Sequence, residues 1–536
     1  MPETAPLTSS EVLLPTLALQ ALLADAGVRE CVICAGARNS ALLVLLAAVP
    51  GLRLWHHFEE RAAAHFALGR ILDHERPVAV VTTSGTAAAE LLPALIEAYY
   101  QGLPLIALTA DRPLPYRGSG APQAIEQANL FGPYADPALD LTCLDQAPAQ
   151  LAALQTWARR GPLHLNLCLE EPTAAALPAL RRAGAALLVP PDAAAAAPPP
   201  DLLPSLPPRP LLLLGDLLPS ERAAAEQFAL SLQAPVYAEA SSGLRESPAL
   251  QPYLIAGGDA ALAQTPHRSV IRLGGVPSCR FWRDLETQTQ LPVFNFTRSG
   301  HPGLARPSQV FPLHSLPAPA PVPVSMVCAP PSAWALALDA CLARHPTSEP
   351  ALVRHCSTLI PRGARVFTGN SLAIRQWNLA ADRALPHHAR ALRGANGIEG
   401  NLSAFLGLAA DAPEAWALVG DLTALYDLAA PWVLPQMPGP RLRIVVIQNA
   451  GGKIFSRLPS LRGLSPFERQ LMENPHHISL VGWAAQWGLA HRVHRGPFPA
   501  DPDLPHRAVI ELHPDPAATE AFWQDWAASA PAAPPP

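Results

Sequence analysis

The feature that most constrains the fold is a pair of apolar runs that each stop at a short polar loop. The run 416–419 stops at Gly420 and Asp421, and the run 444–447 stops shortly before Asn449. Apolar, β-branched runs closed by glycine or asparagine are typical of buried strands. Two parallel strands joined by a crossover bring their loops to the same carboxyl edge of a sheet, where α/β proteins bind ligands.

The two loops together offer three oxygen ligands. Asp421 supplies a carboxylate, Asn449 an amide oxygen, and Gly451 a backbone carbonyl that glycine leaves accessible. Hard oxygens of this kind, with positions left for phosphate oxygens and water, predict a magnesium site that binds a diphosphate. The alternative from either loop alone is that Asp421 caps a helix and that the glycines form an ordinary turn.

Strand-and-loop patterns recur along the chain and predict an α/β fold of parallel sheets flanked by helices. The expected strands are 31–34, 52–56, 78–81, 105–108, 163–169, 211–215, 236–238, 269–273, 416–419 and 444–447. A chain of 536 residues is too long for one core. We therefore expect three domains, 1–180, 181–330 and 331–536, with Ala/Pro-rich linkers at 172–209 and 317–331.

Composition excludes several classes of protein. The net charge of −5 and the pI near 6.4 argue against a nucleic-acid or membrane-surface binder. No export signal opens the chain, and no apolar run reaches membrane-spanning length. The eight cysteines form no disulfide framework, and Cys31 and Cys34 lie in an expected strand where positions three apart face opposite sides. We expect a cytoplasmic protein whose partners include neither a membrane nor nucleic acid.

The motifs form an ordered set that resembles thiamine-diphosphate (ThDP) enzymes. Gly420-Asp421 and Asn449 are similar to the diphosphate-binding signature Gly-Asp-Gly…Asn-Asn, although Leu422 and Gln448 replace two of its residues. The complete set resembles the MenD family of the menaquinone pathway, the 2-succinyl-5-enolpyruvyl-6-hydroxy-3-cyclohexene-1-carboxylate synthases. The segments that carry this resemblance are 35–38, 57–61, 83–87, 109–113, 369–371 with Arg375, 393–398 and 467–469. They cover the two outer domains well and the middle domain weakly.

The resemblance implies a three-domain ThDP fold with a pyrimidine-binding first domain and a diphosphate-binding third domain. It implies a transferase that decarboxylates 2-oxoglutarate and adds the succinyl-semialdehyde unit to isochorismate. The implied cofactors are ThDP and Mg²⁺ or Mn²⁺. The implied assembly is a homodimer or homotetramer with active sites at the subunit interface.

The resemblance also implies roles for individual residues. Glu60 is the expected catalytic residue, because it would hydrogen-bond the aminopyrimidine ring of ThDP and favour its imino tautomer. Without the resemblance, Glu60 reads as a solvated carboxylate at a helix start. The expected cofactor contacts are Glu60, Ser84, Gly85, Gly420, Asn449, Ile398, Ile454 and Phe455, and the expected metal ligands are Asp421, Asn449 and Gly451.

Arginines indicate the chemistry of the substrates. Several arginines expected in loops are costly to hold together unless anions lie between them, and arginine pairs bidentately with carboxylate. Because metal and backbone already serve the diphosphate, the surplus charge favours carboxylate-rich substrates such as the two the resemblance implies. The expected substrate contacts are Arg38, Arg112, Gln123, Arg280, Ser371, Arg375 and Arg393.

Three departures from the family pattern fall in these loops. Ala37 replaces a serine, Pro122 an asparagine, and Ala450 a further asparagine of the metal loop. Two other functions stay open from the sequence. One is a different ThDP-dependent 2-oxoacid decarboxylase or ligase, and the other is a ThDP-fold protein that binds ligand without catalysis.

Overall fold

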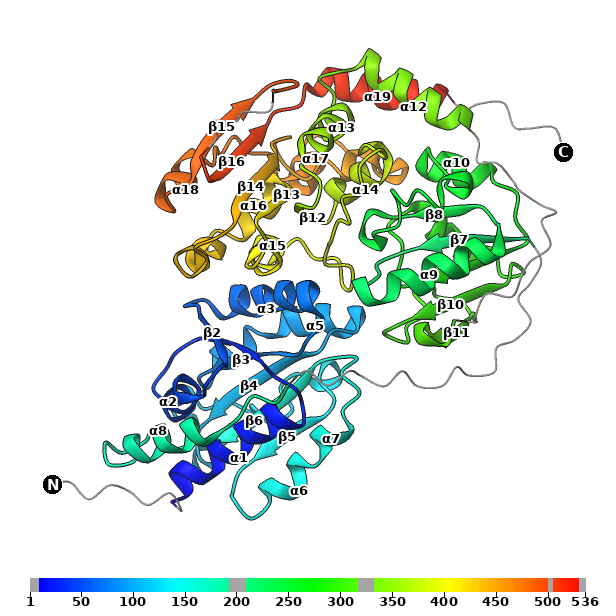
Figure 1. Ribbon diagram of the computed structural model, residues 1–536. Helices are drawn as coiled ribbons and strands as arrows, with labels where there is room; N and C mark the ends of the chain where they lie inside the picture. The colour runs from blue at the N-terminus through cyan, green and yellow to red at the C-terminus, as the bar shows by residue number, and fades with distance from the viewer. Residues whose placement is uncertain (1–8, 192–208, 317–331, 500–504, 530–536) are drawn as a thin grey trace. The chain divides into compact units, whose positions relative to one another are not determined.

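The computed structural model describes residues 9–191, 209–316, 332–499 and 505–529. Three parallel sheets flanked by helices make up these residues, as the sequence predicts for an α/β fold (Figure 1). The chain divides into two compact units. The first unit comprises Met1–Ala196, Leu402–Ala410 and Ala429–Pro438, and the second comprises Ala197–Asn401, Asp411–Leu428 and Gly439–Pro536.

The first unit holds a six-stranded sheet in the order β2-β1-β3-β4-β6-β5. Its strands are β1 (Glu30–Ile33), β2 (Arg53–His56), β3 (Val78–Thr82), β4 (Leu105–Asp111), β5 (Ala138–Leu141) and β6 (Leu163–Cys168). Its helices are α1 (Ser10–Ala24), α2 (Ser40–Ala48), α3 (Glu60–His74), α4 (Thr86–Ala89), α5 (Leu92–Gln101), α6 (Ala147–Leu151), α7 (Ala153–Thr156) and α8 (Leu177–Ala186). Helices α3 and α5 cover one face, and α1, α2 and α8 the other (Figure 1).

Helix α8 corrects the expected linker at 172–209. The segment 177–186 is a helix that packs on α2, and its Ala179 and Leu180 are buried in the core of the first unit. A β-carbon on Gly184 would lie 2.4 Å from the carbonyl oxygen of Leu45, so the two helices approach closely. The prolines of this stretch led to the prediction of a linker. However, a proline is tolerated in the first turn of a helix, and the alanines and leucines that follow stabilise a helix. The boundary expected between 180 and 181 falls inside α8, and 192–208 lies outside the described residues.

The second unit holds two five-stranded sheets, in the orders β11-β10-β9-β7-β8 and β12-β13-β14-β16-β15. The strands of the first are β7 (Pro210–Leu214), β8 (Val236–Ala238), β9 (Ser269–Leu273), β10 (Val293–Thr297) and β11 (Gln309–Pro312). Those of the second are β12 (Arg365–Thr368), β13 (Glu414–Gly420), β14 (Arg441–Ile447), β15 (Ala490–His494) and β16 (Arg507–Leu512). Both sheets follow the parallel pairing that strands with polar loops at one end predict.

The helices of the second unit cover both sheets. They are α9 (Pro219–Leu232), α10 (Gly258–Gln264), α11 (Arg280–Asp284), α12 (Ser332–Arg344), α13 (Glu349–Leu359), α14 (Leu372–Ala380), α16 (Asp421–Tyr426), α17 (Pro466–Glu473), α18 (Val481–Gln486) and α19 (Pro516–Ala528). Helices α12 and α19 lie side by side (Figure 1), and the rings of Trp334 and Trp526 meet at 5.5 Å. These tryptophans share one hydrophobic cluster with Leu211 and Trp282, so α12 and α19 pack beside the β7–β11 sheet. The linker expected at 317–331 lies outside the described residues.

Helix α15 (Asn401–Ala409) packs on α3, and the short helix η7 (Ala430–Gln436) contacts β2. A β-carbon on Gly407 would lie 2.1 Å from the carbonyl oxygen of Phe66.

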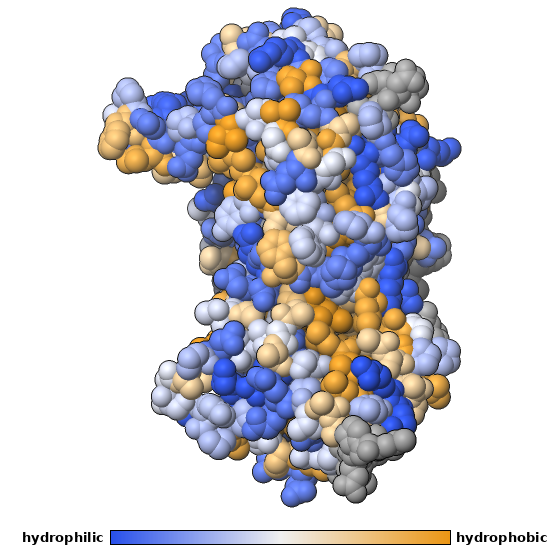
Figure 2. Space-filling model, turned by 90° about the vertical axis from the view of Figure 1, so that its left-hand side faces the viewer, coloured by the Kyte–Doolittle hydropathy of each residue, from blue (hydrophilic) through white to orange (hydrophobic). Residues whose placement is uncertain are grey.

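Apolar side chains also reach the surface in several patches, and Figure 2 shows those on one face of the molecule. In the described ranges no helix is long and apolar enough to span a membrane.

Candidate functional site

The loops after β13 and β14 meet at one edge of the third sheet, as the sequence predicts. The two strands pair in parallel register, with Gly420 opposite Ile447. The backbone N–H of Gly451 donates to Oδ2 of Asp421 at 2.9 Å. Asp421 is therefore in direct contact with the loop that carries Asn449 and Gly451.

Asp421 is buried at the first position of α16. Burial raises its pKa, although hydrogen bonds from the backbone N–H groups of Gly451 and Leu422 oppose the rise. Nε2 of His476 lies 3.4 Å from Oδ2 of Asp421. A divalent cation at this carboxylate would favour its charged form, because the ion is the largest local charge in such a site.

The residues present fit a magnesium or manganese ion. Oδ1 of Asn449 is buried and has no hydrogen-bond partner within the described residues. The backbone of Gly451 has a φ of 125°, and a β-carbon there would lie 2.5 Å from the carbonyl oxygen of Glu473, so only glycine fits. A carboxylate, an unpaired amide oxygen and a glycine carbonyl form the hard oxygen set that these ions prefer.

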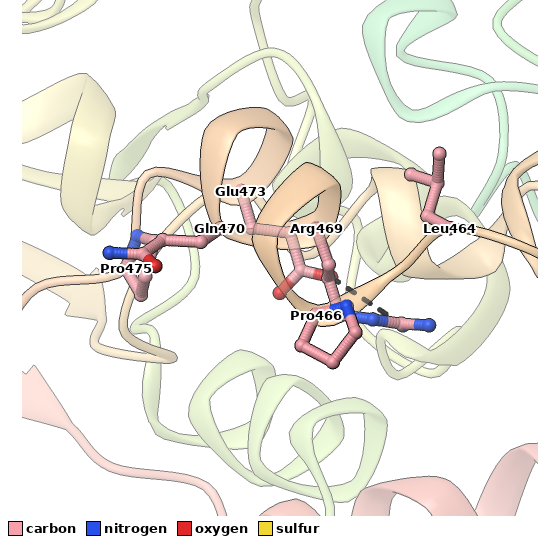
Figure 3. A pocket seen from close by; sticks show the side chains of 6 residues that line it. All are labelled: Leu464, Pro466, Arg469, Gln470, Glu473 and Pro475. Atoms are coloured by element: carbon pink, nitrogen blue, oxygen red, sulfur yellow. Dashed lines mark ion pairs between the residues drawn. The ribbon is translucent and has the colours of Figure 1, made fainter.

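A pocket of about 390 Å³ lies beside this loop (Figure 3). Its lining residues come from α17 and its flanks: Leu464, Pro466, Arg469, Gln470, Glu473 and Pro475. Arg469 and Glu473 form an ion pair at 3.9 Å across one side of it. Glu473 also accepts from Nζ of Lys453 at 2.6 Å, and its carbonyl accepts from the N–H of Gly452 at 2.6 Å. The expected cofactor contacts Ile454 and Phe455 follow directly in this loop, half-buried.

Three expected substrate residues of the second unit, Ser371, Arg375 and Arg393, follow β12 in the chain. Arg375 donates to the carbonyl oxygen of Ser371 at 2.7 Å, and Arg393 donates to Oδ1 of Asn370 at 2.8 Å. The amide nitrogen of Asn370 donates to the carbonyl of Gly397 at 2.7 Å, which ties the loop before Ile398 to the same place. Strand β12 neighbours β13, so this cluster and Asp421 belong to one sheet edge.

Arg375 and Arg393 lie close enough for the charge of one to affect the pKa of the other. Burial and the positive charge of Arg393 lower the pKa of Arg375, while the charges of Glu239 and Asp259 oppose the shift. Nε of Arg393 is buried without a hydrogen-bond partner in the described part of the chain. Like charges held together with an unused donor give this cluster the chemistry to bind an anion.

Two substrate expectations need correction in their placement. Arg375 lies in helix α14, and Arg280 begins helix α11, so neither lies in a loop. Arg280 is 64% exposed and pairs with Asp284 at 3.5 Å on its own helix. Arginine is common in both loops and helices, so the residue type alone could not predict this placement. The neighbouring residues form the helices.

Glu60 begins α3 in the first unit, directly after its N-cap residue Glu59. The Glu59 carboxylate accepts from the N–H groups of Arg61 and Ala62, both at 3.1 Å, so Glu59 rather than Glu60 caps the helix. Burial raises the pKa of Glu60, and the charges of Glu59 and Glu90 raise it further. A half-buried carboxyl with a raised pKa is suited to share a proton with a ring nitrogen.

The loop after β3 carries Ser84 and Gly85, the expected cofactor contacts of the first unit. Ser84 is buried, and its hydroxyl has no hydrogen-bond partner in the described ranges. Gly85 has a φ of 81°, and a β-carbon on it would lie 3.1 Å from Cα of Gln123. The structure thus brings Gln123 against the expected cofactor loop.

The two expected substrate arginines of the first unit differ in their surroundings. Arg38 is buried and donates to the carbonyl of Leu169 at 3.1 Å, with ion pairs to Glu170 at 3.3 Å and Glu171 at 3.4 Å. Arg112 lies over the ring of Tyr116 at 5.3 Å, and its Nε has no hydrogen-bond partner among the described residues. Arg112 therefore has a donor left for an anion, whereas Arg38 is already neutralised.

Three expected site loops contain residues with a positive φ that are not glycine. The φ angles are 57° at Gln123, 65° at Ser371 and 64° at Ala450. Non-glycine residues avoid this region, and the strain they carry clusters at ligand sites. Asparagine tolerates it better than alanine, so the departure at Ala450 has a conformational cost.

Sequence reasoning missed three residues that hold these loops. Glu349 accepts from the amide nitrogen of Asn449, Gln127 accepts from the N–H of Gly85 at 3.0 Å, and His476 contacts Asp421. The amide of Gln127 also donates to Asn166 at 2.8 Å and to the carbonyl of Ala110 at 3.0 Å. Their partners lie far away in sequence, so no local pattern marks them.

A second acidic cluster is an ion-pair network. Asp111, Asp140 and Cys168 lie close enough to share a metal ion. However, Arg117 donates to Asp111 at 2.8 Å, to Asp140 at 2.7 Å and to Sγ of Cys168 at 3.2 Å. The guanidinium occupies the position a cation would take.

Cys31 is buried in the core, as the sequence predicts. Burial raises the pKa of its thiol to about 12, which disfavours the thiolate that a metal would need.

Comparison with known proteins gives matches over nearly the whole chain. Residues 16–130 match the family model described as thiamine pyrophosphate enzyme, N-terminal TPP binding domain. Three bacterial proteins named 2-succinyl-5-enolpyruvyl-6-hydroxy-3-cyclohexene-1-carboxylate synthase are similar to the chain. The one from Akkermansia muciniphila is 43% identical over 92% of this chain and 95% of its own length. The one from Bdellovibrio bacteriovorus is 38% identical over 94% and 96%, and the one from Geobacillus thermodenitrificans 33% identical over 88% and 87%.

Proposed function

The chain belongs to the 2-succinyl-5-enolpyruvyl-6-hydroxy-3-cyclohexene-1-carboxylate synthases, and from that premise we propose how its residues carry out this ThDP-dependent reaction of menaquinone biosynthesis. The chain is a transferase that uses 2-oxoglutarate as donor and isochorismate as acceptor. The observation that carries the proposal is the set of oxygens at one sheet edge, where Asp421 contacts the Gly451 loop and Oδ1 of Asn449 is left unpaired.

In this proposal Asp421, Asn449 and Gly451 would hold Mg²⁺ or Mn²⁺, whose charge would neutralise the diphosphate of the cofactor. When bound, ThDP would supply a nucleophilic carbon for the donor's keto group and an electron sink for decarboxylation. Glu60 holds a proton at its carboxyl oxygen and shares it with the pyrimidine ring, a role its raised pKa supports. Ser84, Gly85, Gly420, Ile398, Ile454 and Phe455 orient the cofactor.

The arginines bind the carboxylates of the two substrates. Arg375 and Arg393 form one anion site with Ser371, and Arg112 with Gln123 forms another. Arg38 is paired with glutamates, so it takes part only if a substrate carboxylate replaces Glu170 or Glu171. Arg280 is the least supported contact, because its charge is on an exposed helix and paired with Asp284.

We also propose a homodimer or homotetramer whose active sites lie at the subunit interface, in the cytoplasm. Exposed apolar residues beside expected site residues support an interface. Phe58, two positions before Glu60, is 57% exposed, and Phe467 and Leu471 of α17 are 67% and 62% exposed. Exposed apolar side chains that form one patch mark surfaces that bind another molecule, and Phe467 and Leu471 lie on the same face of α17.

The experiment that tests the function measures carbon dioxide release from 2-oxoglutarate, with ThDP and Mg²⁺ present. The assay is run with and without isochorismate, whose absorbance is followed in parallel. Turnover that consumes both substrates supports the proposal. Release from pyruvate but not 2-oxoglutarate indicates a different ThDP-dependent decarboxylase, and bound ThDP without turnover of any oxoacid indicates a binding protein.

A further inference from the structure

The amide of Asn449 is held at one end only. Its nitrogen lies 3.2 Å from one carboxylate oxygen of Glu349 and 3.3 Å from the other. Its oxygen, Oδ1, is buried with no hydrogen-bond partner in the described residues. The pair links residues 100 positions apart, so it is a product of the tertiary fold.

The chemistry of the two groups decides which way the amide points. An asparagine amide has a donor end and an acceptor end of nearly equal size, and either end fits the same space. A carboxylate only accepts hydrogen bonds, so it selects the donor end. With the nitrogen turned toward Glu349, the oxygen faces away from Glu349 and is free to bind a cation.

Glu349 is itself fixed by its surroundings. It is the first residue of α13, after the N-cap Ser348, and only 4% of it is exposed. Its N–H donates to the hydroxyl of Thr519 at 3.0 Å, and burial raises the pKa of its carboxyl while interactions with Asn449 and Gln376 favour the charged form. The positive end of the helix favours a carboxylate at this position. A buried, anchored acceptor is well suited to orient another side chain.

We propose that Glu349 is a positioning residue for the metal site, which sets the amide of Asn449 so that Oδ1 faces the cation. The inference rests on the proposed function, because it takes Asn449 to be a metal ligand. Glu349 does not touch the ion. It acts through the hydrogen bonds it accepts from Asn449.

The first test measures Mn²⁺ binding by electron paramagnetic resonance, with ThDP present and no substrate. Glu349→Ala leaves the amide free to rotate, and we expect Mn²⁺ affinity to fall about 10- to 100-fold, as is usual for groups that orient metal ligands. Glu349→Gln preserves the shape but offers either a donor or an acceptor, so we expect a smaller loss. The matched control is Glu414→Gln at the other end of β13, whose carboxylate accepts from Trp416 alone among the described residues, at 2.8 Å. This control is expected to bind Mn²⁺ within about twofold of the wild type.

The second test exchanges the two groups. Asn449→Asp alone places two carboxylates against each other and is expected to weaken Mn²⁺ binding. Adding Glu349→Gln gives the new aspartate a donor, so the double variant is expected to regain at least about fivefold of the lost affinity. A merely structural role for Glu349 predicts additive losses instead. Circular dichroism and the thermal midpoint of each variant verify that it folds.

The outcomes separate the inference from the function on which it rests. Weaker binding in the Glu349 variants together with recovery in the double variant supports the inference. Wild-type affinity in both Glu349 variants, or additive losses in the exchange, overturns it while leaving the function intact. A wild-type protein that binds no Mn²⁺ with ThDP overturns the metal site and the inference together.

Discussion

Two glycines let helices α3 and α15 touch through their backbones. A β-carbon on Gly69 would lie 1.9 Å from the carbonyl oxygen of Ala404 and 2.8 Å from the backbone nitrogen of Leu408. Ordinary contact begins near 3.4 Å, so α15 would have to move by about 1.5 Å to admit one methyl group. Both obstacles are backbone atoms, which no side-chain rotation removes.

The change Gly69→Ala is therefore expected to destabilise the first unit. Overpacking of a well-packed interface costs roughly 1–3 kcal/mol, and a backbone clash belongs at the upper end. Alanine is favoured over glycine in a helix by about 1 kcal/mol, which offsets part of that cost. The expected net loss in the free energy of unfolding is about 2 kcal/mol. Because α3 begins at Glu60, a shift of α3 relative to α15 is also expected to weaken the binding of ThDP to the protein.

The assay is urea denaturation followed by tryptophan fluorescence and by circular dichroism. Trp55 reports on α3, since its ring meets that of Phe66 at 4.9 Å. The matched control is Gly482→Ala in α18, where no described residue beyond its chain neighbours and its own helix backbone lies within 4 Å of the added methyl group. This control is expected to be neutral or up to about 1 kcal/mol more stable. A Gly69→Ala protein as stable as the control would refute the close approach of α3 and α15.

Three further predictions follow from single residues. Glu60→Gln is expected to lower carbon dioxide release at least about 100-fold while ThDP still binds, as measured by fluorescence quenching; full activity would rule out the proton role of Glu60. Ala450→Asn is expected to raise the free energy of unfolding by about 1 kcal/mol, because asparagine tolerates the φ of 64° better, and a lower urea midpoint would contradict this. Burial alone would raise the pKa of Glu30, but hydrogen bonds from His74 and the charge of Arg70 bring it down to about 2. Its folded pKa is below the unfolded value, so about 3 kcal/mol of stability present above pH 4.5 is lost as the pH falls toward 2. Urea midpoints of the wild type and Glu30→Gln should converge over that window, and a constant difference would be the contrary result.

The sequence alone determined the class of fold and which polar loops share one edge of the third sheet. Apolar runs such as 416–419 and 444–447 form neighbouring parallel strands, because strands buried on both faces need apolar side chains at successive positions. Polar loops at their carboxyl ends then had to share one edge. That edge brings Asp421 within hydrogen-bond distance of the Gly451 loop, as the pattern predicts.

The local sequence pattern gave wrong predictions in two kinds of place. One is a helix within an Ala/Pro-rich stretch, and the other is where helix and loop were both plausible. The segment 177–186 was hidden in the Ala/Pro-rich stretch 172–209, yet it forms α8, with Ala179 and Leu180 buried and Gly184 close to α2. Arg375 and Arg280 were expected in loops and lie on helices. In each case the tertiary contact or the neighbouring residues outweighed the signal of the residue itself.

Only the tertiary structure decided which groups support the site. Glu349 meets Asn449, and Gln127 meets Gly85, across separations that no periodicity encodes. The positive φ at Ser371 is likewise invisible in the sequence, since a serine has no preference for it. A sequence specifies ligands through their type and spacing. The orientation of each ligand depends on buried partners that only the folded chain brings together.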